Sequence, residues 1–217
     1  MSEIIRIAID GPGGAGKSTI AKEVSSILGI DYVDTGAMYR AVAYKMKKHE
    51  ISPDEVEKIS EILDETDIAF SKGEIYLDGE NVEKYIRTEE ISKLASTFSK
   101  LAVVRKKLVE IQRKMATKQS LVMDGRDIGT NVIPDAENKF FITAEAEERA
   151  KRRYLQQKEK DGSADYNKIL KDIKERDYMD SHREINPLKK AEDAINVDTT
   201  KMSIEQVVDF ILSSLKR

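Results

Sequence analysis

Residues 4–19 read Ile-Ile-Arg-Ile-Ala-Ile-Asp-Gly-Pro-Gly-Gly-Ala-Gly-Lys-Ser-Thr, and this stretch decides the fold of the chain. Its first half is an apolar run typical of a buried strand, and its second half fits the pattern Gly-x-x-x-x-Gly-Lys-Ser from Gly11 to Ser18. Apolar residues then recur at helical spacing over residues 20–28. A strand, a glycine-rich turn and a helix in this order predict a P-loop rather than an accidental glycine-rich turn.

A P-loop binds phosphate through backbone N–H groups that its glycines allow to turn inward. We expect Lys17 to reach the β- and γ-phosphates of a nucleoside triphosphate and the Ser18 hydroxyl to bind Mg²⁺. The helix that opens at Gly16 adds the positive end of its dipole. The predicted nucleotide-binding residues are Gly11, Pro12, Gly13, Gly14, Ala15, Gly16, Lys17, Ser18 and Thr19.

The composition limits the possible partners. With 217 residues, of which 40% are hydrophobic, the chain is long enough for one α/β core with an insertion. A net charge of −3 lacks the basic excess of a nucleic-acid-binding protein, and the absence of cysteine excludes disulfides and thiolate sites. The apolar runs are too short for a bilayer and no signal-like segment precedes the first strand. We expect a cytoplasmic monomer with no nucleic-acid or membrane partner.

A second anion site is predicted after the next strand. Residues 29–36 read as a short strand that ends in a turn, and a helical pattern with Thr35 as its N-cap follows. This order of elements predicts a parallel sheet, in which ligands bind beyond the carboxyl ends of the strands. We therefore expect Thr35 and Arg40 to hold an anion beside the P-loop. The alternative is that Arg40 is a surface arginine on a packed helix.

The middle of the chain contains an insertion and two helices. Residues 68–82 read as a small antiparallel β meander. This insertion is either decorative or functional, and in the functional case Arg87 at its edge reaches a ligand. Residues 88–118 are helical in pattern with a break near Ser99. In the second of these helices Arg105 shares a face with a leucine and a glutamine, which makes it a site candidate unless it is solvated.

The next apolar strand begins at Ser120 and ends in the charged loop Asp124-Gly-Arg-Asp127. Asp124 lies at the strand end, where a carboxylate can hold Mg²⁺ through water. Arg126 and Asp127 can offer a phosphate ligand and a hydrogen-bond acceptor. A local arginine–aspartate ion pair within the turn is the alternative.

Two later helices carry charged faces. After a fourth strand at residues 138–143, a helix places three arginines on one face: Arg149, Arg152 and Arg153. The polar run 156–163 that follows is either a mobile flap over a polyphosphate or a solvated helix end. The next helix places three charged residues on one face, as site residues or as an internal salt-bridge ladder: Arg176, Asp180 and Arg183. A fifth strand at residues 194–199 and a last helix close the chain.

A P-loop, a second anion site and several further arginines together describe a protein that holds two phosphate groups end to end. This combination indicates phosphoryl transfer between nucleotides. In that chemistry the protein positions the donor and the acceptor in line and neutralises charge, so no covalent nucleophile is needed.

The sequence resembles bacterial cytidylate kinases, within the P-loop nucleoside monophosphate kinases, nearly from end to end. The P-loop by itself indicates only a nucleoside triphosphate, whereas the Asp124-Gly-Arg-Asp127 loop together with Glu175-Arg-Asp177 is far more specific. The other motifs that carry the resemblance are Asp34-Thr-Gly-Ala-Met-Tyr-Arg40, Ile86-Arg-Thr88, Val104-Arg105, Glu148-Arg-Ala-Lys-Arg-Arg153 and Pro187-Leu188.

The resemblance implies a role for each matching residue. The implied CMP-binding residues are Thr35, Arg40 and Arg126 at the phosphate, Ser96, Arg105, Asp127 and Arg183 at the cytosine, and Arg176 and Asp180 at the ribose and phosphate region. The implied lid residues are Arg149, which also binds ATP, Arg152 and Arg153. The implied catalytic residues are Lys17, Arg126, Arg152, Arg153 and Arg176.

We therefore expect a three-layer α/β P-loop kinase with a five-stranded parallel sheet, a small antiparallel β insert and a short helical lid. The expected single domain, 1–217, has a core (1–35, 119–147 and 184–217), a monophosphate-binding region with the insert (about 36–118) and a lid (about 148–166). The expected reaction is ATP-dependent phosphorylation of CMP and dCMP to CDP and dCDP with Mg²⁺. The alternatives are a kinase for another small acceptor, such as UMP or shikimate, and a nucleotide-dependent switch, although no Asn-Lys-x-Asp guanine motif is present.

Overall fold

The computed structural model describes residues 4–71 and 73–216. Residues 1–3, Lys72 and Arg217 of the predicted domain lie outside the described residues. The chain forms two compact units. The first unit is built mainly from residues 31–120, and the second from residues 5–30 together with the chain from 121 onward.

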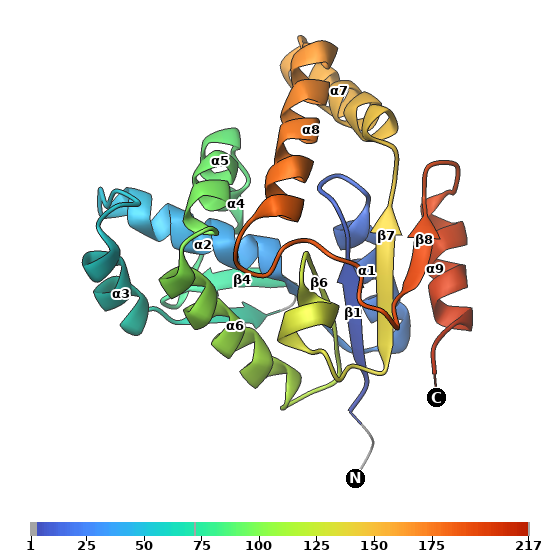
Figure 1. Cartoon of the computed structure of the whole chain (residues 1–217), viewed down its shortest axis with the longest axis horizontal. Coiled ribbons are helices and arrows are strands. Elements are labelled where there is room, and N and C mark those ends of the chain that lie inside the picture. Colours follow the sequence, from blue (N-terminus) through green and yellow to red (C-terminus); the bar gives the residue numbers. More distant parts are fainter. Residues whose placement is uncertain (1–3, 72, 217) are drawn as a thin grey trace. The chain divides into compact units, whose positions relative to one another are not determined.

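The core of the second unit is a parallel sheet. Strand β1 (Arg6–Asp10) lies between β6 (Leu121–Gly125) and β7 (Asn138–Thr143), and β8 (Ile195–Asp198) pairs with β7, with every pair parallel (Figure 1). Ile7, Ala8 and Ile9 of β1 are all buried, as expected for a parallel strand covered on both faces. The whole sheet has five strands in the order β2-β6-β1-β7-β8, in which β2 spans Asp31–Asp34. The predicted fold class is confirmed.

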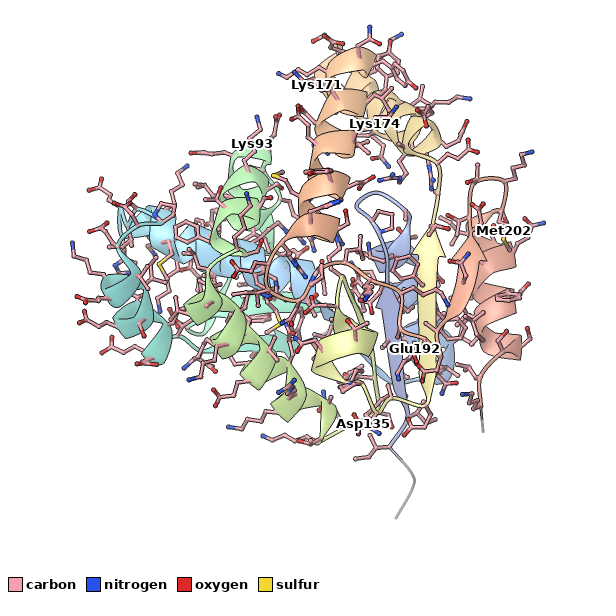
Figure 2. The ribbon with its side chains drawn as sticks, in the orientation of Figure 1. Lys93, Asp135, Lys171, Lys174, Glu192 and Met202 are labelled. Carbon is pink, nitrogen blue, oxygen red and sulfur yellow. The ribbon has the colours of Figure 1, made fainter. Side chains whose placement is uncertain are left out.

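Four helices and one π-helical turn complete the second unit: α1 (Lys17–Leu28), η1 (Ile128–Val132), α7 (Ala146–Asp161), α8 (Tyr166–His182) and α9 (Ile204–Ser213). Helix α1 packs on β1 and β6 and against α9. Helices α7 and α8 pack on each other through Ala150, Ile169 and Ile173. Lys171 and Lys174 are exposed side chains of α8 (Figure 2), and Lys174 forms an ion pair with Glu147 of α7. None of the helices among the described residues is long and apolar enough to cross a membrane.

The first unit contains a strand and five helices, and a separate antiparallel sheet. Its elements are β2 (Asp31–Asp34), α2 (Thr35–Lys48), α3 (Val56–Asp64), β3 (Ile68–Ser71), β4 (Glu74–Leu77), β5 (Glu80–Asn81), α4 (Glu83–Ile86), α5 (Glu89–Phe98) and α6 (Ala102–Ala116). Strand β4 pairs with β3 and β5 in an antiparallel manner, which confirms the predicted meander. The predicted break near Ser99 is also confirmed, because α5 ends at Phe98 and α6 begins at Ala102.

The prediction that Thr35 caps α2 is wrong by one residue. Thr35 is the first residue of the helix, and Asp34 is its N-cap, with Oδ1 accepting a hydrogen bond from the Ala37 N–H at 2.7 Å. A carboxylate is a better cap than a threonine hydroxyl at this position because its charge also complements the positive end of the helix.

Candidate active site

The glycine-rich turn between β1 and α1 has a backbone that other residues cannot adopt. Gly11 has φ +147°, and a Cβ atom on it would lie 1.9 Å from the carbonyl oxygen of Ile142 in β7. Gly16, the N-cap of α1, has φ +91°. The turn therefore packs tightly against the sheet, and its close approach at Gly11 requires a residue without a side chain.

Lys17 is buried at the start of α1, and its Nζ donates a hydrogen bond to the carbonyl oxygen of Pro12 at 2.9 Å. The pKa of Lys17 is lowered to about 7, chiefly by burial and then by the positive charge of Arg126, whereas Asp124 and Asp10 act in the opposite direction. A buried ammonium group at the head of a P-loop is well placed to gain from a bound phosphate, because phosphate oxygens would replace the water that it has lost.

The two residues predicted for Mg²⁺ are in contact. The Ser18 hydroxyl donates to Oδ2 of Asp124 at 2.9 Å, so the hydroxyl and carboxylate oxygens lie together beside Lys17. Hard oxygen ligands of this kind suit Mg²⁺, which takes one or two protein oxygens and fills its other positions with substrate phosphates and water. Among residues 4–71 and 73–216, no group of three or more acidic or histidine side chains gathers as a metal cage.

Asp10 is a buried carboxylate that the sequence analysis did not assign. It accepts hydrogen bonds from the N–H groups of Ile128 at 2.8 Å and Gly129 at 2.7 Å, and so holds the η1 turn directly after Asp127. Burial raises the pKa of Asp10 to about 6, although both N–H groups favour the charged form. The sequence offers one sign of this role, because Asp10 is an acidic residue at the end of an apolar strand.

The charged loop after β6 is joined to the end of α8. The Arg126 Nε donates to Asp180 at 2.8 Å, and Arg183 donates to Asp127 at 2.9 Å. Burial by itself would raise the pKa of Asp180, but the charge and hydrogen bond of Arg126 together with the charges of Arg176 and Arg183 outweigh it, so that the pKa lies below its usual value. A purely local ion pair in the turn does not account for these two long-range contacts.

The alternative of an internal salt-bridge ladder along α8 explains only part of the charged face of this helix. Arg176 lies 4.0 Å from Asp180, which is one step of such a ladder. Arg183 is the C-cap of α8, and its side chain reaches Asp127 instead. Asp180 and Arg183 therefore contact the loop after β6, and Arg176 lies beside Asp180.

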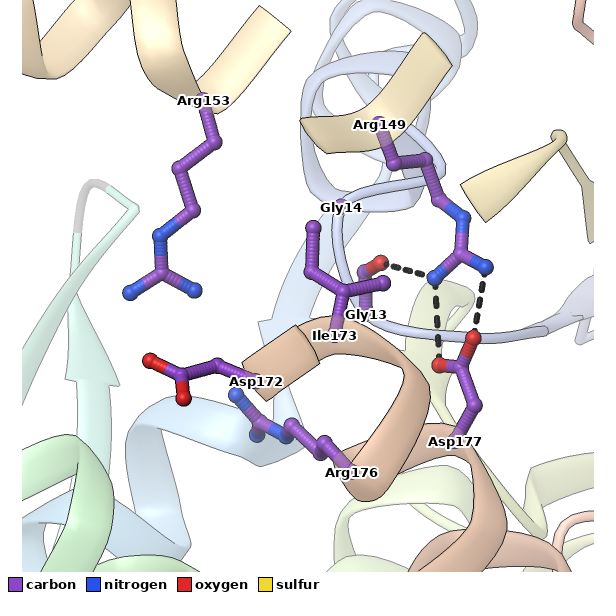
Figure 3. Close-up of a pocket in the computed structure, with 8 residues that line it drawn as sticks. All are labelled: Gly13, Gly14, Arg149, Arg153, Asp172, Ile173, Arg176 and Asp177. Carbon is purple, nitrogen blue, oxygen red and sulfur yellow. Dashed lines mark hydrogen bonds and ion pairs between the residues drawn. The ribbon is translucent and has the colours of Figure 1, made fainter. Parts of the chain in front are cut away.

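Arg149 of α7 connects the P-loop to α8. Its guanidinium donates to the Gly13 carbonyl at 2.9 Å and forms a two-pronged ion pair with Asp177 (Figure 3). Its Nε donates to the carbonyl of Ala144. The sequence analysis gave Asp177 no role of its own, because it lies 28 residues from its partner and no spacing pattern connects the two.

The other two arginines of α7 also lie toward the P-loop. Arg153 and Arg176 line a small cavity of about 70 Å³ together with Gly13 and Gly14 (Figure 3). A Cβ atom on Gly16 would lie 3.9 Å from a terminal nitrogen of Arg152. The other terminal nitrogen of Arg152 is buried and has no hydrogen-bond partner. Such an orphaned donor beside a phosphate loop is a site for an anion.

In the first unit, Asp34 holds two arginines at the start of α2. Its Oδ2 accepts from Arg40 at 3.0 Å and from Arg87 at 3.1 Å. Burial acts to raise the pKa of Asp34, but the two guanidinium charges and the Ala37 N–H lower it below the usual value. The adjacent Thr35 is buried. Arg40 is therefore oriented by a buried carboxylate, and its role at a second anion site stays a prediction.

Arg105 is buried in α6 and not solvated, since only 2% of it is exposed. Its guanidinium lies 5.7 Å from the centre of the Tyr39 ring and donates to the carbonyl of Ser99 at 3.4 Å. Ser96 is half-buried on α5. The predicted residues Thr35, Arg40, Ser96 and Arg105 thus belong to the first unit, and the other predicted site residues belong to the second.

The chain is similar to known proteins over nearly its whole length. A family model described as cytidylate kinase matches residues 7–217. A cytidylate kinase of Clostridium perfringens (strain SM101) is 49% identical over 217 residues, which cover 100% of both chains. A cytidylate kinase of Caldicellulosiruptor bescii is 52% identical over 212 residues, which cover 96% of this chain and 94% of the relative. Among solved structures, an uncharacterized protein from Eubacterium ventriosum has the same fold, with a TM-score of 0.51, 19% identity and 97% coverage of both chains.

Proposed function

The chain belongs to the cytidylate kinase family, and we propose that it transfers the γ-phosphoryl group of ATP to CMP and dCMP, giving CDP and dCDP. The observation that carries this proposal is the convergence of α7 and α8 on the P-loop, through the contact of Arg149 with Gly13. Phosphoryl transfer depends on positioning and on neutralising the charge of the moving group, and this arrangement supplies both.

The P-loop is the proposed donor site. Its backbone N–H groups and Lys17 would bind the phosphates of ATP, and the oxygens of Ser18 and Asp124 would hold Mg²⁺, which supplies positive charge at the β- and γ-phosphates when bound. Arg152 and Arg153 would meet the transferring phosphoryl group from α7, since both lie beside glycines of the loop. The remaining proposed ATP-binding residue outside the loop is Arg149.

The proposed acceptor residues are those that the family resemblance implies. Thr35, Arg40 and Arg126 would bind the CMP phosphate, and Arg176 and Asp180 would bind the ribose and phosphate region. Ser96, Arg105, Asp127 and Arg183 would surround the cytosine. A carboxylate suits the exocyclic amine of cytosine and repels O4 of uracil, so Asp127 would favour CMP over UMP.

The proposed organisation is a single P-loop kinase domain in which the sheet and the P-loop form the core. Residues of about 36–118 would form the monophosphate-binding region, and residues of about 148–166 would form a lid that closes over the polyphosphate and excludes water. We propose a cytoplasmic monomer with no nucleic-acid partner, supported by a net charge of −3. Its proposed partners are its small-molecule substrates.

A coupled assay of ADP release against CMP, dCMP, UMP and shikimate tests the proposal. We expect activity with CMP and dCMP that far exceeds activity with the other acceptors, and little ADP release without an acceptor. Lys17→Ala should abolish transfer, whereas Lys22→Ala on the exposed side of α1 should not. Hydrolysis of ATP that does not depend on an acceptor would instead identify a nucleotide-dependent switch.

A further inference from the structure

The first unit carries a hollow of about 360 Å³ whose lining residues differ from those assigned above to substrates. It lies among α2, α4 and α5, and its lining combines aromatic rings with cationic side chains. The residues on which the argument rests are Tyr44, Tyr85, Lys47, Lys48, Lys84 and Glu90. Aromatic rings and cations together recognise ligands that have a flat ring at one end and negative charge at the other.

The aromatic part is a stacked pair of tyrosines. The rings of Tyr44 and Tyr85 have centroids 5.5 Å apart and planes inclined by 7°. Tyr44 comes from α2 and is half-buried, whereas Tyr85 comes from α4 and is 49% exposed. The half-exposed ring is thus held on a second ring, which orients it for stacking with a planar ligand.

Cationic side chains line the hollow together with this tyrosine pair. Three lysines and one glutamate in the lining leave a local charge of +2, in a chain whose net charge is −3. Lys47 lies 2.5 Å from Glu90, and Lys48 lies 3.8 Å from a glutamate of β5, with all four side chains 46% exposed or more. Ion pairs this exposed contribute little, so these lysines can turn toward a more highly charged ligand at small cost.

We propose that this hollow is a second nucleotide-binding site, which takes a nucleoside triphosphate by stacking the base on Tyr85 and binding the phosphates with Lys47, Lys48 and Lys84. Arg40 lies on α2, and Arg87 directly follows α4. Both arginines contact Asp34. The test must therefore distinguish binding in this hollow from binding at the proposed acceptor site. It must also give an answer whether or not the chain phosphorylates CMP.

Nuclear magnetic resonance of the full chain with isotope-labelled tyrosine rings meets both requirements. The chain has 8 tyrosines, and Tyr44→Phe and Tyr85→Phe would assign the two signals of interest. CTP is the probe. Cytidine and inorganic triphosphate are titrated separately, because cytidine offers the ring without the charge and triphosphate offers the charge without the ring. We expect CTP to shift the Tyr85 signal saturably, and to bind at least about 10-fold more tightly than either partial ligand.

Variants separate this site from a general surface effect. Lys84→Gln should raise the Kd of CTP measured at Tyr85 by about 3-fold or more, whereas Lys93→Gln, an exposed lysine elsewhere on α5 (Figure 2), should leave it unchanged. Tyr85→Ala should weaken binding measured at Tyr44 by about 10-fold, and Tyr85→Phe should not. The proposal is overturned if millimolar CTP leaves the Tyr85 signal in place, if inorganic triphosphate binds as tightly as CTP, or if both lysine variants behave alike.

Discussion

Arg183 donates a hydrogen bond to Asp127 at 2.9 Å, and the two side chains are only 10% and 7% exposed. The second carboxylate oxygen of Asp127 accepts from the side-chain amide of Asn131 at 3.1 Å. Asp127 is thus held on both oxygens, once by the end of α8 and once by the η1 turn. A carboxylate that is held in this way can discriminate between bases, because it cannot move aside for an unfavourable one.

Asp127→Ala should reduce the kcat/KM for CMP far more than that for UMP, and should narrow the ratio of the two by at least about 10-fold. The reason is that the lost carboxylate would accept from the cytosine amine but repel O4 of uracil. Steady-state kinetics with both acceptors measure the ratio, and Asp135→Ala, which removes an exposed carboxylate, is the control. If both acceptors lose the same factor, Asp127 acts on phosphate geometry, and base selection passes to Ser96, Arg105 and Arg183.

Arg40→Ala should raise the KM for CMP by about 10-fold or more and lower kcat, while the KM for ATP stays within about 2-fold. The expected size is that of one hydrogen bond between charged groups. Arg87→Ala should act in the same direction, because Asp34 holds both arginines. Arg113→Ala, an exposed arginine on α6, should have no such effect. An equal loss of ATP and CMP affinity would argue against a separate acceptor site.

Arg152→Ala and Arg153→Ala should each lower kcat by at least about 10-fold with smaller effects on both KM values. Arginines that meet the phosphoryl group stabilise charge that develops in the transition state, so their loss appears mainly in kcat. Lys151→Ala changes an exposed residue of the same helix and serves as the matched control. Wild-type turnover in both arginine variants would show that this face of α7 is only solvated.

The ionisation of Asp10 should reduce the stability of the folded protein as the pH rises from about 4 to about 6. Its folded pKa of about 6 lies above the value of 3.8 for an unperturbed aspartate, so the folded state binds the proton more tightly than the unfolded state does. This contribution is fully present below the unfolded pKa and is lost as the pH rises through 6. At pH 7 the loss amounts to about 3 kcal/mol.

Urea unfolding of the wild type and Asp10→Asn at several values between pH 4 and pH 7 measures this effect. The free energy of unfolding of the wild type should fall relative to that of the variant as the pH rises, because the variant cannot ionise. Comparing the two proteins cancels carboxylates such as Asp34 and Asp180, whose lowered pKa values produce the opposite trend. A difference between the two proteins that does not change with pH would contradict the raised pKa.

The local elements of the fold could be predicted because short-range patterns specify them. The apolar run before Gly11, the helical spacing after Lys17 and the period-two meander at residues 68–82 all appear in the structure. The wrong N-cap prediction for α2 also concerns residues that are adjacent in the chain. Asp34 and Thr35 are both good N-cap residues, and only the position of β2 relative to the helix selected the aspartate.

By itself, the sequence determined the P-loop and the α/β class, and it offered most of the charged candidates for the site, because each of these depends on residues that are close in the chain. Only the tertiary structure decided how these charges pair: Arg149 with Asp177, Arg183 with Asp127, and Asp10 with the η1 turn. With 37 basic and 40 acidic residues, the chain offers many pairings that local spacing cannot rank. Packing of the strands and helices selects among them, because a buried charge is stable only where a partner meets it.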